Sequence, residues 1–234
     1  MDGKTVVVTG ASRGVGEAVA RLLASEGARV VACARTETDL GTLAEDVEAS
    51  DAPGSVEAVR ADVRDEFDLE RVMESAARGG DGVDAVVACA GVNHAAPGEA
   101  PLDGESYSRF DDTMRTNVRG VFATVREAVP HLTADARVLV PSGSVAREAK
   151  PGMGAYAVSK AAAEALVRGF AADTEAAVGV VDPGLVATDV SGGQGRDPDD
   201  VAPMFLWALA DLDADDLDGE VVDLRAWRSA TRSR

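Results

Sequence analysis

Short runs of apolar, largely β-branched residues alternate along the chain with stretches in which apolar positions recur every three or four residues. The runs predict strands buried on both faces, and the periodic stretches predict helices that bury one face. Predicted strands cover residues 4–9, 29–34, 56–61, 84–89, 137–141, 178–181 and 220–224. Predicted helices cover residues 16–26, 39–48, 66–78, 106–129, 154–174 and 200–210.

This alternation of strands and helices predicts the architecture. Parallel strands need a crossover between them, and a helix is the usual crossover. We therefore expect an α/β fold: a doubly wound parallel sheet of about seven strands with helices on both faces. Glycine and proline gather in residues 91–104, and a polar, glycine-rich stretch covers 191–199, so both segments are predicted loops. No repeat or linker interrupts the pattern, so residues 1–234 are expected to form a single domain.

Composition and charge exclude several classes of protein. The 46% of hydrophobic residues can bury a sizeable core, which argues against disorder. A formal charge of −18 repels phosphate backbones and anionic lipid, so we expect neither nucleic-acid nor membrane binding. No apolar run approaches the roughly 20 residues of a membrane span, and the first strand leaves no room for a signal peptide, so we expect a cytoplasmic protein. The two cysteines, Cys33 and Cys89, form no disulfide framework and no metal-binding pattern.

The excess of acidic residues has two interpretations. It is either an ordinary solvated surface that keeps the protein soluble, or an adaptation to the cytoplasm of a salt-accumulating organism, where screening removes self-repulsion. Asp outnumbers Glu by 25 to 16, and the chain has only 3 Lys, which favours the second interpretation.

A glycine-rich turn joins the first predicted strand to the first predicted helix. Residues 9–16 read T-G-A-S-R-G-V-G, with glycine at Gly10, Gly14 and Gly16. Glycines allow a tight turn and a close approach of the backbone to a pyrophosphate, which then lies at the positive end of the helix. This position therefore predicts a dinucleotide site, with the spacing T-G-x-x-x-G-x-G.

A second motif, Tyr156-Ala157-Val158-Ser159-Lys160, lies at the start of the alanine-rich helix. A spacing of four residues places Tyr156 and Lys160 on one helix face. A nearby ammonium group favours the phenolate, so we expect Lys160 to move the pKa of Tyr156 from about 10 toward the working range. Because the chain has only two tyrosines and three lysines, a chance pairing is improbable.

Both motifs resemble those of the short-chain dehydrogenase/reductase family, and the resemblance extends from about residue 5 to 224. It implies a Rossmann-type oxidoreductase domain that transfers a hydride between a nicotinamide and a ketone, aldehyde or secondary alcohol. Three departures stand out. The family's N-N-A-G reads Ala88-Cys89-Ala90-Gly91 here, and the double glycine common after the last strand is missing. The family's serine position, 13 residues before the tyrosine, is Gly143.

The resemblance also implies catalytic residues. Tyr156 would be the general acid and base, and Lys160 would lower its pKa and hold the nicotinamide ribose. Asn117, in an N-V-x-G pattern, would support a water-linked proton path to the lysine. A serine at the end of the fifth strand would bind the substrate oxygen; the local pattern S-V-A favours Ser144, with Ser142 as the alternative.

The preferred dinucleotide depends on the end of the second strand. A carboxylate there would bind the adenosine ribose and repel a 2′-phosphate, but the residues are Ala34-Arg35-Thr36. Arg35 and Arg13 suit bidentate phosphate binding, which predicts NADP(H), with NAD(H) as the alternative cofactor. Together with the resemblance, this gives the predicted cofactor-binding residues: Gly10, Ser12, Arg13, Gly14, Val15, Gly16, Arg35, Asp62, Val63, Ala90, Gly91, Tyr156, Lys160, Pro183, Gly184, Val186 and Thr188.

Other functions remain to be weighed against hydride transfer. A non-catalytic NADP(H)-binding regulator or scaffold is the main alternative, although such relatives tend to lose the tyrosine or the lysine. A lyase or dehalogenase on the same sheet would be expected to lose the glycine turn or to replace the lysine. The expected partners are a small carbonyl or alcohol substrate and further copies of the chain, in a homodimer or homotetramer formed through the helices of residues 106–129 and 154–174.

Overall fold

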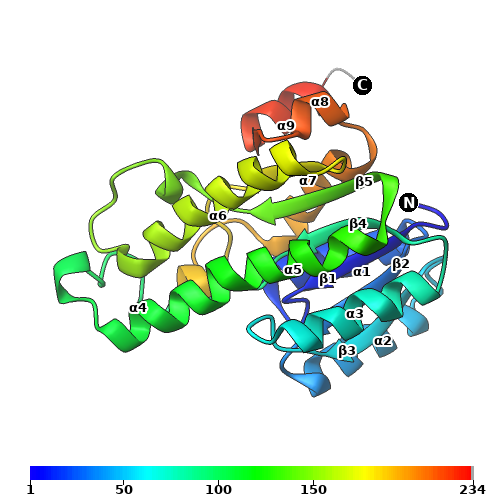
Figure 1. The fold of residues 1–234 in the computed structure, drawn as a ribbon, viewed down its shortest axis with the longest axis horizontal. Coiled ribbons are helices and arrows are strands. Elements are labelled where there is room, and N and C mark those ends of the chain that lie inside the picture. The colour runs from blue at the N-terminus through cyan, green and yellow to red at the C-terminus, as the bar shows by residue number, and fades with distance from the viewer. Residues whose placement is uncertain (233–234) are drawn as a thin grey trace.

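The computed structural model describes residues 1–232 and contains one seven-stranded sheet in which every neighbouring pair of strands is parallel. Its strand order is β3-β2-β1-β4-β5-β6-β7 (Figure 1). The predicted fold class is confirmed. The strands are β1 (Thr5–Thr9), β2 (Arg29–Ala34), β3 (Ser55–Arg60), β4 (Val83–Ala88), β5 (Leu132–Pro141), β6 (Ala177–Asp182) and β7 (Val221–Asp223).

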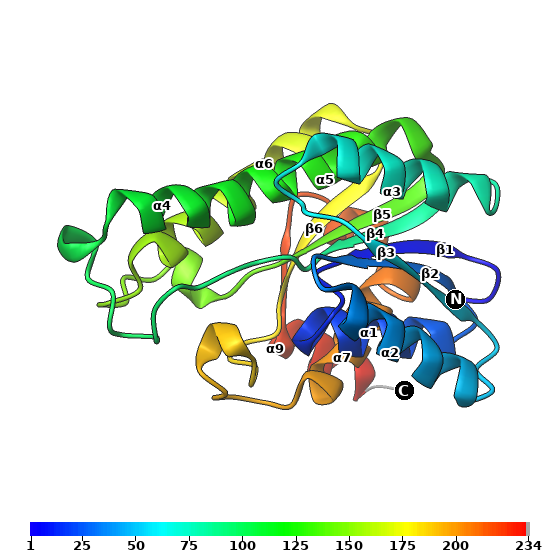
Figure 2. The same ribbon diagram turned by 90° about the horizontal axis from the view of Figure 1, so that it is seen from below.

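Helices cover both faces of this sheet (Figure 2). One face carries α1 (Gly14–Ser25), α2 (Glu37–Ala49) and α7 (Pro198–Ala210). The opposite face carries α3 (Glu66–Arg78), α5 (Gly120–Ala128) and α6 (Gly154–Asp173). Beyond the sheet, α4 (Tyr107–Met114) continues the line of α5, and the chain ends in α8 (Ala214–Leu217) and α9 (Leu224–Thr231) (Figure 1).

Two apolar cores separate the sheet from its helices. In β1, Val6 and Val8 belong to the core under α1 and α7, whereas Val7 belongs to the core under α3, α5 and α6. All three side chains are fully buried, as expected for a strand whose residues alternate between two covered faces. The largest fully buried side chain, Phe205 of α7, belongs to the first core.

The strand order also determines where a ligand can bind. From β1 the chain winds to β2 and β3 on one side, and β4 opens the other half of the sheet. Loops at the carboxyl ends of β1 and β4 therefore diverge and leave a crevice between them, which is the usual binding position in sheets of this kind.

The structure differs from the sequence prediction in three places. A π-helical turn (Arg115–Arg119) divides the predicted helix of residues 106–129. β5 begins five residues earlier than predicted, because Leu132 pairs with Val83 across an irregular register. α8 and α9 were not predicted, and Leu224 begins α9 rather than ending a strand, because the Asp223 carboxylate accepts the Arg225 and Ala226 N–H groups. Within residues 1–232, no helix is both long and apolar enough to span a membrane.

Candidate active site

A cleft of about 640 Å³ opens at the carboxyl ends of the strands. Its walls come from the glycine turn after β1 and from the loops after β2, β3, β4, β5 and β6. Every residue predicted to bind the cofactor lines this cleft, and so do Ser142 and Ser144. The structure thus brings together residues that lie up to about 175 positions apart in the sequence, with the predicted catalytic residue Asn117 just behind the wall.

The glycine turn fits closely against the loop after β4. Gly10 has a φ of +66°, and a Cβ on it would lie 2.7 Å from the Ala90 Cα. A Cβ on Gly16 would lie 2.4 Å from the Gly10 carbonyl oxygen. α1 begins at Gly14, and among the described residues the Arg13 side chain makes no capping hydrogen bond. The Glu17 N–H bonds to the Arg13 carbonyl at 3.5 Å, so the N–H groups of Gly14, Val15 and Gly16 are the ones that can bind an anion in the cleft.

One buried hydroxyl group in the cleft wall also points to a ligand. Thr116, on the π-helical turn, is 7% exposed and lines the cleft. Its Oγ1 has no hydrogen-bond partner among residues 1–232. Because a buried hydroxyl is costly to leave unpaired, this atom fits a polar ligand such as a dinucleotide. The sequence prediction missed Thr116, whose only sequence signal is that it directly precedes Asn117.

The two arginines predicted to bind a phosphate lie in the cleft wall, but one has an unexpected partner. Arg13 forms an ion pair of 3.0 Å with Asp189, and both side chains are more than two thirds exposed. Arg35 is exposed at the end of β2. Hydrogen bonds from Arg64 lower the pKa of Asp62, and the charge of Arg35 contributes to the same shift. Because both side chains are exposed to water, the ion pair between Arg13 and Asp189 holds Arg13 only weakly.

Tyr156 and Lys160 are one turn apart on α6, as predicted, and both line the cleft. The Lys160 Nζ lies 5.7 Å from the centroid of the Tyr156 ring and donates a hydrogen bond of 3.0 Å to the Pro141 carbonyl. Burial raises the pKa of Tyr156 to about 12, with a further contribution from the charge of Asp182. Burial also lowers the pKa of Lys160. The expected lowering of the tyrosine pKa is therefore wrong for the protein alone, because burial dominates the shift and the charge of Asp182 raises the pKa further.

The two candidate serines have different partners. Ser142 donates a hydrogen bond of 2.7 Å to the Glu164 carboxylate behind the cleft wall. Ser144 Oγ accepts a hydrogen bond from the Lys150 ammonium, which leaves its own proton available to a substrate oxygen. This arrangement favours Ser144 over Ser142 as the serine that contacts substrate.

An ion cluster that the sequence did not reveal supports the site from behind. The Glu164 and Asp182 side chains are only 4% and 9% exposed, and Arg147 bonds to both carboxylates. Asp182 also accepts the Gly184 N–H at 3.0 Å. Because two buried carboxylates need a counter-charge, Arg147 holds the ends of β5, α6 and β6 in a fixed arrangement. An acidic residue within the alanine-rich helix was the only signal in the sequence.

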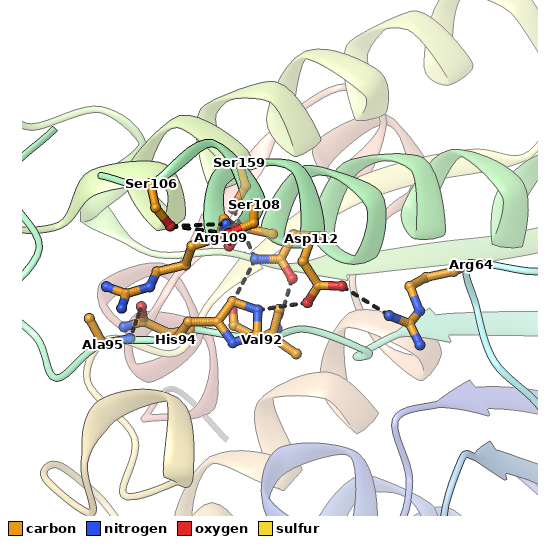
Figure 3. A network of polar contacts seen from close by, with 12 residues as sticks. Arg64, Val92, His94, Ala95, Ser106, Ser108, Arg109, Asp112 and Ser159 are labelled. Carbon is orange, nitrogen blue, oxygen red and sulfur yellow. Dashed lines mark hydrogen bonds and ion pairs between the residues drawn. The ribbon is translucent and has the colours of Figure 1, made fainter. Parts of the chain in front are cut away.

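Asn117 lies on the π-helical turn and is 2% exposed. Its amide accepts the Val92 N–H at 2.8 Å and donates to the Val92 carbonyl and the Ser159 hydroxyl, both at 2.9 Å. Figure 3 labels Val92 and Ser159, the two residues that these hydrogen bonds reach. Asn117 therefore connects the loop after β4 to α6. It does so from a π-helical turn, a feature that often occurs at functional sites.

A chain of charges crosses the outer side of this loop (Figure 3). His94 lies in the loop after β4, and its Nε2 is 2.7 Å from Asp112 Oδ2. The other oxygen of Asp112 accepts a hydrogen bond of 2.9 Å from Arg64, which in turn binds Asp62. His94 thus anchors the loop after β4 to α4 and to the turn after β3.

Comparison with known proteins places this geometry in a family. The family model for short chain dehydrogenases matches residues 4–199. A glycine betaine reductase of Emericella nidulans is 33% identical over 230 residues, which cover 89% of this chain but only 18% of that much longer protein. An NADPH-dependent aldehyde reductase of Arabidopsis thaliana is 32% identical, with 80% of this chain and 74% of the relative covered.

Solved structures agree over nearly the whole chain. A short chain dehydrogenase from Burkholderia cenocepacia in complex with NADP superposes with a TM-score of 0.84 at 26% identity, covering 96% of this chain and 97% of the other. An alcohol dehydrogenase from Thermococcus sibiricus, complexed with 5-hydroxy-NADP, gives a TM-score of 0.82 at 29% identity, with 94% and 95% covered. On its fold, its glycine turn and these matches, the chain belongs to the short-chain dehydrogenase family of oxidoreductases.

Proposed function

We propose that this protein is an NADP(H)-dependent oxidoreductase that interconverts a ketone or aldehyde and the corresponding alcohol, with Tyr156 as general acid and base. One observation carries the proposal. Tyr156 and Lys160 lie one turn apart on α6 and face the same cleft that the glycine turn and the two arginines line. The tyrosine hydroxyl, the lysine ammonium and the glycine turn that would bind a dinucleotide thus line one cavity.

In this proposal the dinucleotide extends along the cleft. The backbone of the glycine turn binds the pyrophosphate at the start of α1. Arg13 and Arg35 bind the 2′-phosphate, and Thr116 offers its unpaired hydroxyl to the adenosine half. Asp62, Val63, Ala90 and Gly91 flank that half, while Pro183, Gly184, Val186 and Thr188 flank the nicotinamide half. The bound dinucleotide supplies the hydride for the carbonyl carbon and is oxidised in doing so.

The chain's own residues handle the oxygen. Ser144 donates a hydrogen bond to the carbonyl oxygen, and Tyr156 gives that oxygen its proton as the carbon accepts the hydride. A tyrosine pKa of about 12 keeps the phenol protonated at neutral pH, which is the form that reduction requires. Lys160 stabilises the phenolate that is left, and Asn117 fixes the loop after β4 beside this pair.

Replacing both Arg13 and Arg35 with alanine tests the cofactor assignment. We expect the Kd for NADPH to rise about 10- to 100-fold and the Kd for NADH to change less than about threefold, because only NADPH carries the 2′-phosphate. Titration of cofactor fluorescence measures both constants.

Replacing Asp189 with alanine removes the carboxylate that pairs with Arg13 and is expected to lower the Kd for NADPH, measured by the same titration.

Arg71→Ala is the matched control, since this arginine lies on α3 and contacts only Asp68 among the ion pairs of the described residues. The assignment fails if the double variant weakens NADPH and NADH equally, or if it leaves both unchanged.

We also propose that the chain forms a homodimer or homotetramer through α5 and α6. Phe122 of α5 is 40% exposed and lies against Phe170 of α6, with ring centroids 5.9 Å apart. A second copy would bury this exposed aromatic surface.

A further inference from the structure

Lys150 is a lysine in the substrate end of the cleft that the proposed mechanism does not use. It lies in the loop between β5 and α6 and lines the cleft. Its Nζ donates a hydrogen bond to Ser144 Oγ, and Glu148 is its other partner at 3.4 Å. Its side chain is 45% exposed and Glu148 62%, so this ion pair is weak and water can replace it. The Lys150 ammonium has three N–H donors, so at least one of them is available to a substrate beside Ser144.

The charge of the cleft is opposite to that of the protein. The chain carries a net charge of −18, yet among residues 1–232 the cleft is lined by four cationic side chains and only two carboxylates. Asp62 pairs with Arg64, which lies outside the lining, and Asp189 pairs with Arg13, one of the four cations, so the positive side chains remain in excess. The cavity is thus a locally positive site within a negative surface, which is the arrangement that attracts anionic ligands.

Three of the four cations already have a role in the proposed function. Arg13 and Arg35 bind the cofactor phosphate, and Lys160 is bonded to the Pro141 carbonyl beside Tyr156. Lys150 is the remaining positive charge, and it lies at the substrate end. We propose that Lys150 binds a carboxylate of the substrate. The substrate is then an oxo acid rather than a neutral carbonyl compound, and this inference rests on the proposed function.

The position of Lys150 limits where that carboxylate can be attached. Its Nζ is within one hydrogen bond of Ser144 Oγ, and the substrate carbonyl oxygen is one hydrogen bond from the same atom. The ammonium is then at most about 5–6 Å from the carbonyl oxygen. A carboxylate attached to the carbonyl carbon itself or to the carbon next to it reaches the ammonium, which describes a 2-oxo or a 3-oxo acid. A single ammonium group beside Glu148 also suits one negative charge better than two.

The rest of the substrate faces apolar side chains. These residues, which line the same cleft as Ser144 and Tyr156, are Val92, Pro97, Val145, Met153, Leu185 and Val190. Apolar side chains do not distinguish an acid from an ester of the same shape, so the Lys150 ammonium makes that distinction by its charge.

The test compares each acid with its methyl ester, so that only the charge differs. Wild-type protein, Lys150→Met and Lys150→Arg are assayed with NADPH on acetoacetate and methyl acetoacetate, and on pyruvate and methyl pyruvate. Lys4→Met is the matched control, because Lys4 pairs with Asp84 at the opposite end of the sheet. Binding of acetoacetate to the protein–NADPH complex is measured separately by the change in NADPH fluorescence.

We expect the wild type and Lys4→Met to prefer the acids by about tenfold or more in kcat/KM. Lys150→Met should lower the acid-to-ester ratio by about 10- to 100-fold, chiefly through KM, and Lys150→Arg should keep most of it. This ratio separates binding of the carboxylate from any effect transmitted through Ser144, which would act on acid and ester alike.

Three results would overturn the inference: equal use of acid and ester by the wild type, an unchanged ratio in Lys150→Met, or acetoacetate binding that persists in that variant. Failure of the proposed function looks different, since NADPH would then not bind or neither acids nor esters would be reduced. If the panel is not reduced but NADPH binds, the acetoacetate titration alone decides whether Lys150 holds a carboxylate.

Discussion

Replacing Tyr156 with phenylalanine is expected to lower the rate of carbonyl reduction by about 10²- to 10⁴-fold, the usual contribution of a positioned general acid. The substitution removes the hydroxyl group and keeps the ring that lines the cleft. The Kd for NADPH should therefore change less than about threefold, and the melting temperature should stay close to that of the wild type. Steady-state assays of NADPH oxidation and fluorescence titrations measure these effects on the same samples.

The pH dependence gives a second, independent measure of the same role. Because burial raises the pKa of Tyr156 to about 12, the phenol stays protonated at neutral pH and the rate of reduction should be nearly constant between about pH 6 and 9. Alcohol oxidation needs the phenolate, so its rate should rise about tenfold per pH unit over this range. In Tyr156→Phe, the rate of reduction should be low at every pH, and the rise of the oxidation rate with pH should be lost. A variant that keeps more than about a tenth of wild-type activity would refute the assignment of Tyr156.

Replacing Gly16 with alanine is expected to weaken NADPH binding by about 100-fold or more and to lower the melting temperature by several degrees. The added Cβ would lie 2.4 Å from the Gly10 carbonyl oxygen and 3.2 Å from the Ala11 Cα, both of them backbone atoms that cannot rotate away. The turn must therefore open, and the N–H groups that face the cleft lose their arrangement. Thermal denaturation and NADPH titration test the two effects.

Gly41→Ala is the matched control for this substitution. Gly41 also lies in a helix, α2, but a Cβ on it meets no atom of the described residues within 4 Å. The same change should leave NADPH binding intact and stabilise the protein by about 0.4–1 kcal/mol, because alanine favours the helix. If Gly16→Ala behaves like Gly41→Ala, the close packing of the glycine turn is not what binds the cofactor.

Much of the fold could be predicted from the sequence because its signals are local. The bounds of α3 were predicted as they occur, since Leu69, Val72, Met73 and Ala76 form a buried stripe and Asp65 caps the first turn. The π-helical turn could not be predicted in this way. Its Asn117 bonds to Val92 in the loop after β4, and no helical periodicity records such a contact.

The same distinction applies to the candidate site. The glycine turn and the Tyr156–Lys160 pair are each contained in fewer than ten residues, so spacing alone indicates their chemistry. The ion cluster of Arg147, Glu164 and Asp182 joins three separate elements and becomes evident only when the sheet is assembled. The tyrosine pKa was predicted in the wrong direction for a related reason, because desolvation depends on every surrounding element and not only on the lysine one turn away.

Hydride transfer itself can be followed with NADPH that carries deuterium at both C4 positions of the nicotinamide. The wild-type protein is incubated with this cofactor and a panel of ketones, aldehydes and oxo acids, and the alcohols formed are analysed by mass spectrometry. We predict one deuterium on the carbon that carried the carbonyl in the product of at least one compound, and product formed at least about 100-fold more slowly with Tyr156→Phe. NADPH that binds in the cleft while no deuterium reaches any carbonyl would contradict the account and would indicate a non-catalytic NADP(H)-binding protein.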